Sequence, residues 1–102
     1  MSSLRTYLAL GDSMSIDFYT RVRGGGATSQ LHRRLGAGWM LDDRTEDGCV
    51  IARAPRDGHG HLITLTVGGN DLRVRAQEIL EDRFAAFRDA HLALLRAVRQ
   101  AN

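Results

Sequence analysis

Lysine is absent from this sequence, and all 14 basic residues are arginine. A chain without lysine has neither the lysine of a Walker A phosphate loop nor a lysine that forms a Schiff base. The single cysteine, Cys49, excludes an internal disulfide framework and a multi-cysteine zinc site. No apolar run approaches the roughly 20 residues of a transmembrane helix, and the N-terminus shows no secretory signal. We therefore expect a cytoplasmic protein without membrane contact.

The rest of the composition is that of a globular protein, and the length of 102 residues suits one small domain spanning residues 1–102. The 12 acidic residues are interspersed among the arginines and the formal net charge is only +2, so no basic face for nucleic acid is expected. His59 and His61 form a close pair of potential metal ligands without a further ligand cluster. We expect neither a metal nor a cofactor.

Two apolar, β-prone segments each end in a glycine-containing turn. Thr6–Leu10 is followed by Gly11-Asp12-Ser13, and Leu62–Val67 is followed by Gly68-Gly69-Asn70-Asp71. Helical segments between and after them predict an α/β architecture with parallel strands. Because ligands gather at the carboxyl ends of such strands, both turns are candidates for one shared site.

Two helices are expected around these strands. Ser29 is a suitable N-cap for a helix through Leu35, after a flexible glycine loop. Apolar residues at spacings of three and four then predict one amphipathic helix from about Arg75 to Gln100.

The two turns together resemble the N-terminal part of the SGNH (GDSL-type) hydrolase family, on the residues Gly11-Asp12-Ser13-Met14-Ser15 and Val67-Gly68-Gly69-Asn70-Asp71. The resemblance implies a flavodoxin-like three-layer parallel sheet, truncated here to about three strands plus a long C-terminal helix. It also implies a serine ester hydrolase of the esterase or lipase type that acts on a small ester without a cofactor.

The resemblance assigns a role to each residue of the two turns. Ser13, at an exposed strand end, is the expected nucleophile, and its backbone N–H joins the Asn70 amide in the oxyanion hole. The family's further oxyanion donor is a glycine after the second strand, for which Gly48 is the best match. The expected supporting residues of the turns are Gly11, Asp12, Gly69 and Asp71.

The position of the second strand is open in the sequence. The resemblance requires that Asp42–Asp47 contain or follow a strand, although this segment is acidic and poor in β-formers. Local propensity instead favours a strand at Cys49–Ala52. Gly48 is accordingly either an oxyanion donor or an ordinary turn glycine.

The sequence has no Asp-x-x-His motif, from which the family takes its general base. Asp89-Ala90-His91 is one residue too short, and we expect His91 in the core or at its boundary. His59 and His61 precede the third strand, at the end of the sheet opposite to Ser13. A serine hydroxyl without a base is a poor nucleophile at neutral pH. The domain therefore looks incomplete at its C-terminus, and the alternative function is a non-catalytic remnant or interaction module.

The segment Leu62–Val67 contains neither a charge nor a proline. In the family it is an interior strand, whereas here only one helix follows it. An unprotected strand edge pairs readily with another chain. We therefore expect self-association, or docking of a complementing chain, through residues 62–67.

Overall fold

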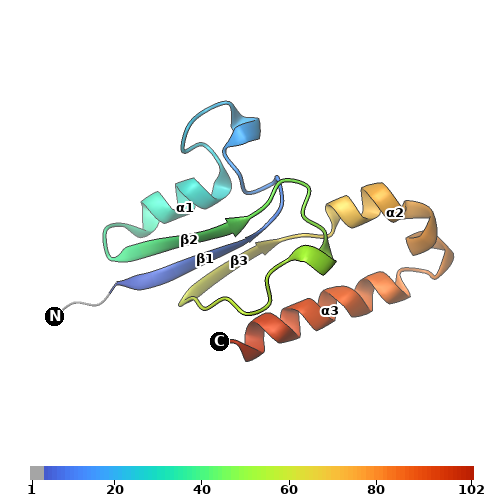
Figure 1. Ribbon diagram of the computed structural model, residues 1–102. Coiled ribbons are helices and arrows are strands. Elements are labelled where there is room, and N and C mark those ends of the chain that lie inside the picture. The colour runs from blue at the N-terminus through green and yellow to red at the C-terminus, as the bar shows by residue number, and fades with distance from the viewer. Residues whose placement is uncertain (1–3) are drawn as a thin grey trace.

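The computed structural model describes residues 4–102 and is built on an open, all-parallel sheet of three strands (Figure 1). The strands are β1 (Arg5–Gly11), β2 (Trp39–Thr45) and β3 (Leu62–Thr66), and they lie in the order β2-β1-β3. Three α-helices and two short 3-10 turns are the other elements of residues 4–102. The predicted α/β class and the first and third strands are confirmed.

The central strand β1 forms the most deeply buried part of the sheet. Its residues Tyr7–Leu10 are at most 1% exposed. Each of them pairs in register with both neighbours, so that Tyr7 lies beside Leu41 of β2 and Leu62 of β3. A parallel strand covered on both faces is apolar throughout, which explains why this segment was legible in the sequence.

The second strand is Trp39–Thr45, so the prediction of a strand at Cys49–Ala52 is wrong. Pairing with β1 along seven residues outweighs the poor local propensity of this acidic segment. The edge position also leaves its charged side chains in contact with solvent. Cys49 and Ile51 are buried instead through a loop, in which Ile51–Arg53 forms the 3-10 turn η2.

The first helix, α1 (Ala27–Leu35), begins two residues before the predicted cap, and its N-cap residue is Gly26. Ser29 lies inside the helix and donates its hydroxyl to Asp17 Oδ1 at 2.8 Å. The backbone N–H groups of Gly24 and Gly26 donate to the same carboxylate, each at 2.8 Å. The glycine loop therefore wraps the chain's own Asp17, next to the 3-10 turn η1 (Phe18–Thr20).

The expected single helix over Arg75–Gln100 is in fact two helices, α2 (Gly69–Glu81) and α3 (Ala85–Gln100). Between them Arg83 and Phe84 adopt left-handed backbone conformations, with φ of 55° and 67°. The Phe84 N–H closes the end of α2 by donating to Ile79 O at 2.9 Å. The chain thereby reverses, and α3 runs back along β3 (Figure 1).

On the face of the sheet that α3 covers, the core lies between α3, β3 and the loop after β2. Leu94 of α3 is fully buried with Cys49, Ile51 and Ala54. The partly buried side chains packed against this cluster are Leu65, Val67, Phe87 and Val98. No helix within residues 4–102 is long and apolar enough to cross a membrane.

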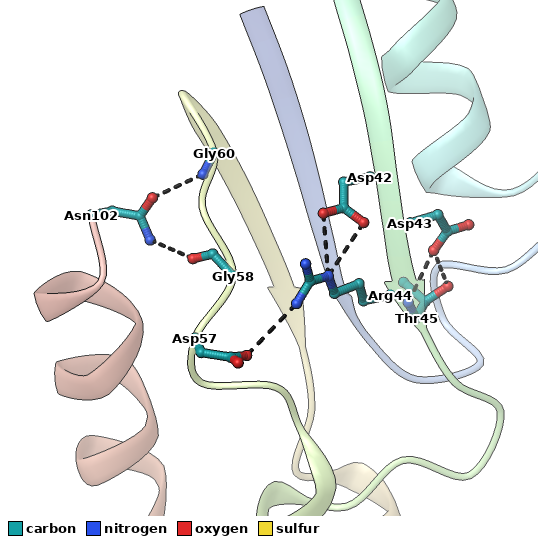
Figure 2. Close-up of polar contacts among 8 residues, drawn as sticks. All are labelled: Asp42, Asp43, Arg44, Thr45, Asp57, Gly58, Gly60 and Asn102. Atoms are coloured by element: carbon teal, nitrogen blue, oxygen red, sulfur yellow. Dashed lines mark hydrogen bonds and ion pairs between the residues drawn. The ribbon is translucent and has the colours of Figure 1, made fainter.

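The far end of α3 is tied to the start of β3 by the last residue (Figure 2). Asn102 donates its side-chain amide to Gly58 O at 2.9 Å and accepts the Gly60 N–H at 2.8 Å. These two bonds fix the C-terminal end of α3 at the start of β3.

Candidate active site

The three strands end at the same edge of the sheet (Figure 1). Short hydrogen bonds join the segments that follow them. Asp12 N–H, after β1, donates to Thr66 O of β3 at 2.8 Å. Glu46 N–H, after β2, donates to Gly11 O at 2.8 Å. The turn containing Ser13 therefore lies between the ends of the other two strands.

Gly11 allows β1 and β3 to approach closely at this edge. Its φ of +142° lies in the region that disfavours L side chains, and a Cβ here would come within 2.8 Å of Thr66 N. The side chain of Ser15, two residues after Ser13, is buried and shares a 2.8 Å hydrogen bond with Thr66 Oγ1. The turn is thus fixed on β3 from both sides of Ser13.

Asp12 stabilises the turn that contains Ser13 by accepting hydrogen bonds from its backbone. Its carboxylate is buried and accepts the Met14 N–H at 3.1 Å, while its carbonyl accepts the Ser15 N–H, also at 3.1 Å. Ser13 stands between these anchored residues and is partly exposed.

Asn70 and Asp71 lie in the first turn of α2, not in a turn before the helix as expected. Asn70 Nδ2 donates to Cys49 O at 3.1 Å, and the Asp71 carboxylate accepts the buried Ile51 N–H at 3.1 Å. Both side chains attach the loop after β2 to the start of α2. One of the two Asn70 amide hydrogens is used in this way, and the other is left for a further acceptor.

The two predicted backbone donors have no acceptor within residues 4–102, since neither the Ser13 N–H nor the Gly48 N–H donates a hydrogen bond there. Gly48 follows β2, is exposed, and has a φ of +78°. Gly69 is exposed at the first position of α2. The positive end of the α2 dipole lies at the same edge.

The pKa of the Cys49 thiol reflects its burial and the carboxylates around it. Burial raises the pKa of its thiol, and the nearby carboxylates of Glu46, Asp12 and Asp71 raise that pKa further. The thiol is therefore neutral at physiological pH and is no competing nucleophile.

Three of the four histidines lie at the other end of the strands. His61 N–H donates to Thr6 O at 2.8 Å, and His61 Nδ1 accepts the Thr6 N–H at 3.0 Å. His59 is two residues earlier, and His32 Nε2 bonds Trp39 O at the start of β2.

Only His91 lies near the candidate site's end of the sheet. It is half-buried, with its ring 6.3 Å from that of Phe87, close to Gly68 at the end of β3. No hydrogen bond joins Ser13 to a histidine in the described part of the chain, and no group of metal-ligating side chains is found in that part.

Sequence reasoning missed a set of exposed apolar side chains after Ser13, namely Met14, Phe18, Tyr19 and Val22. Tyr19 donates its hydroxyl to Asp47 Oδ2 at 2.8 Å, and this bond raises the pKa of the phenol. The β1–α1 loop is thereby tied to the loop that carries Gly48. Apolar residues without clear periodicity give no signal that distinguishes a rim from a core.

A scan against protein-family models and searches of curated proteins and of solved structures found no match to this chain.

Proposed function

We propose that this chain is a serine ester hydrolase of the SGNH type, in which Ser13 takes the acyl group of a small ester. One observation carries the proposal: the Ser13 turn, the Gly48 loop and the Asn70 side chain are joined at one edge of the sheet. Within residues 4–102, two backbone N–H groups and one amide hydrogen at this edge have no acceptor. These are the donors that an oxyanion requires.

The reaction follows from these groups. Ser13 Oγ attacks the ester carbonyl and gives its proton to a base, while the carbonyl oxygen becomes an oxyanion held by Ser13 N–H, Gly48 N–H and Asn70 Nδ2. Collapse of this intermediate breaks the ester C–O bond, and the alcohol leaves with the proton from the base. Water then hydrolyses the acyl-serine in the same way.

In this scheme the supporting residues Asp12 and Asp71 hold the oxyanion donors in place. Asp12 fixes the turn through Met14 N–H, and Asp71 fixes the Gly48 loop through Ile51 N–H. Oxyanion donors that are held in place before the reaction need no reorganisation during it. The Asn70 amide is oriented by its bond to Cys49 O.

The fold agrees with the proposal. The order β2-β1-β3 equals the first part of the flavodoxin-like order 2-1-3-4-5, in which ligands bind at the carboxyl ends of the strands. We propose that the chain is the N-terminal part of such a three-layer domain.

The general base is the one catalytic group of this scheme without an assigned residue. Its absence favours one alternative function. Because no described histidine bonds Ser13, the chain by itself turns over slowly, or it is a non-catalytic interaction module. His91 is the histidine to test as a base, since the other three lie at the opposite end of the sheet.

The experiment is hydrolysis of a short-chain p-nitrophenyl ester by the wild type and two serine variants. Ser13→Ala abolishes turnover, whereas Ser15→Ala, which removes one anchor of the turn and leaves the nucleophile, lowers it by much less. Equal rates in wild type and Ser13→Ala contradict the proposal. His91→Gln then separates a chain that supplies its own base, in which the rate falls, from one that does not.

A further inference from the structure

The loop between β1 and α1 carries three exposed side chains with apolar surface just after the proposed nucleophile. Met14 is 75% exposed, Phe18 is 76% exposed and Tyr19 is 59% exposed. The rings of Phe18 and Tyr19 are in edge contact, with their centroids 5.1 Å apart. Single exposed apolar residues are common, whereas several in one short segment mark a surface that binds an apolar partner. We call these three side chains the apolar strip.

Hydrogen bonds fix the backbone that presents the apolar strip. The Thr20 N–H and hydroxyl both donate to Asp17 O, at 2.9 Å and 2.6 Å, and the Val22 N–H donates to Thr20 Oγ1 at 3.2 Å. The Asp17 carboxylate is turned toward the glycine loop, where it accepts the N–H groups of Gly24 and Gly26. The polar groups of this segment are thus used within the loop, and its bonded backbone holds the apolar side chains outward.

The apolar strip begins at the candidate active site. Met14 directly follows Ser13 in the chain. At its other side, Tyr19 donates its hydroxyl to Asp47 Oδ2 at 2.8 Å, and Asp47 directly precedes Gly48. The strip therefore adjoins both proposed backbone donors of the oxyanion hole, the N–H groups of Ser13 and Gly48.

The side from which the base acts determines which part of an ester lies on the apolar strip. In acyl transfer the base returns the serine proton to the leaving alcohol, so the alcohol lies on the side of the base. His91, beside Gly68, is on the β3 side of Ser13, and strands that complete the order 2-1-3-4-5 are also added beyond β3. The strip lies on the opposite side, with α1 and the end of β2 (Figure 1). The acyl chain, and not the alcohol, is therefore directed toward the strip.

We propose that the apolar strip binds the alkyl chain of the acyl group, so that the substrates are esters of medium-chain fatty acids and not acetyl esters. This inference rests on the proposed function. With the ester carbonyl at the oxyanion donors, the first carbons of the acyl chain pass Met14, and the later carbons lie against the rings of Tyr19 and Phe18. An acetyl group is too short to reach these rings. Strands added beyond β3 leave the strip uncovered, so the same subsite exists in a longer domain.

The chain length of a fatty acid provides the test. A fully buried methylene group raises an affinity about fourfold, so one that is covered on a single face raises it about twofold. Octanoate extends butanoate by four methylene groups, and we therefore expect it to bind about tenfold more tightly. Both acids place their carboxylate at the same oxyanion donors, so the comparison isolates the contribution of the alkyl chain.

The experiment is NMR of isotope-labelled methionine methyl groups in the full chain, titrated with octanoate and with butanoate below the micellar concentration. We expect octanoate to shift the Met14 methyl signal, whereas the Met40 methyl, at the opposite end of the sheet and 51% exposed, does not respond. Phe18→Ser lowers the preference for octanoate severalfold. Leu80→Ser alters an apolar side chain that is 61% exposed near the end of α2, and it leaves this preference unchanged. Far-UV circular dichroism verifies that both variants are folded.

A wild-type Met14 signal that does not respond, or equal affinities for butanoate and octanoate, overturns the proposal. A response that occurs only with micelles, or that follows protein concentration alone, overturns it equally, because the apolar strip then binds an aggregate or a second copy of the chain. Ester hydrolysis by the same protein distinguishes this inference from the proposed function. Turnover at Ser13 without a chain-length-dependent Met14 response contradicts the acyl subsite alone. The expected Met14 response without turnover or labelling at Ser13 contradicts the hydrolase alone.

Discussion

Replacement of Asn70 by alanine separates a catalytic role of this side chain from a structural one. The Asn70 amide has two hydrogens, one of which bonds Cys49 O at 3.1 Å. In our account the second hydrogen bonds the oxyanion. Asn70→Ala removes both interactions, so the variant loses stability and transition-state stabilisation together.

The two losses have different sizes. Leaving the carbonyl of the buried Cys49 unpaired costs about 1–3 kcal/mol of stability, against a total of about 5–15 kcal/mol for a domain of this size. The variant therefore remains folded. Loss of one oxyanion donor lowers kcat about a hundredfold or more, with little change in KM.

Asp71→Ala is the matched control, because it breaks the neighbouring bond to the buried Ile51 N–H and costs a similar stability without removing an oxyanion donor. Urea denaturation gives the stability of both variants, and ester hydrolysis per folded molecule gives kcat. We expect the larger fall in kcat in Asn70→Ala, and a smaller fall in Asp71→Ala, whose carboxylate only positions the Gly48 loop. Equal falls in both variants, or unfolding of Asn70→Ala, would show that Asn70 only closes the loop.

Three further predictions concern the fold. Leu94→Ala, in the core, lowers the free energy of unfolding in urea by about 2–5 kcal/mol, whereas Leu92→Ala on the exposed side of α3 changes it by less than about 1 kcal/mol. Gly68→Ala is destabilised by more than about 1 kcal/mol in the same assay, because of a φ of +117° and a Cβ 3.2 Å from the Phe87 ring. Hydrogen bonds, first that of Ser29, hold the pKa of Asp17 below its ordinary 3.8. Its stabilising effect is thus present above that value and is lost as the pH falls through the lowered pKa. Asp17→Asn reduces this acid dependence of the melting temperature, and an unchanged dependence contradicts the assignment.

The sequence predicted those parts of the fold in which local pattern and tertiary packing agree. β1 is apolar because the sheet buries it, and β3 is a short β-prone run that is partly buried, so both segments were found within one or two residues. β2 was ambiguous because its stability comes from pairing with β1 and not from its own residues. The apolar run Cys49–Ala52 reflects burial of a loop, which a propensity argument cannot distinguish from a strand.

The helical errors have a similar origin. The break at Arg83 and Phe84 lacks glycine and proline, so no local signal marks it. Ser29 was assigned as a cap from its residue type, whereas its hydroxyl bonds a carboxylate 12 residues earlier in the chain. Such long-range partners are set by the fold.

The candidate site was accessible from the sequence to the extent that strand ends determine it. Turns after two parallel strands lie at one edge of the sheet, and on this basis the sequence predicted Ser13 and Asn70 at the same end of it. The bonds from Asn70 to Cys49 and from Asp71 to Ile51 were not predictable, since they depend on the path of the loop after β2.

Covalent labelling with a fluorophosphonate probe tests the central claim most directly, because the probe reports an activated serine and maps it by mass spectrometry of the peptides. We predict one phosphonylated residue, Ser13, with labelling retained in Ser15→Ala, lost in Ser13→Ala and slowed in Asn70→Ala. Absence of labelling in the folded wild type, or its retention in Ser13→Ala, would contradict the account.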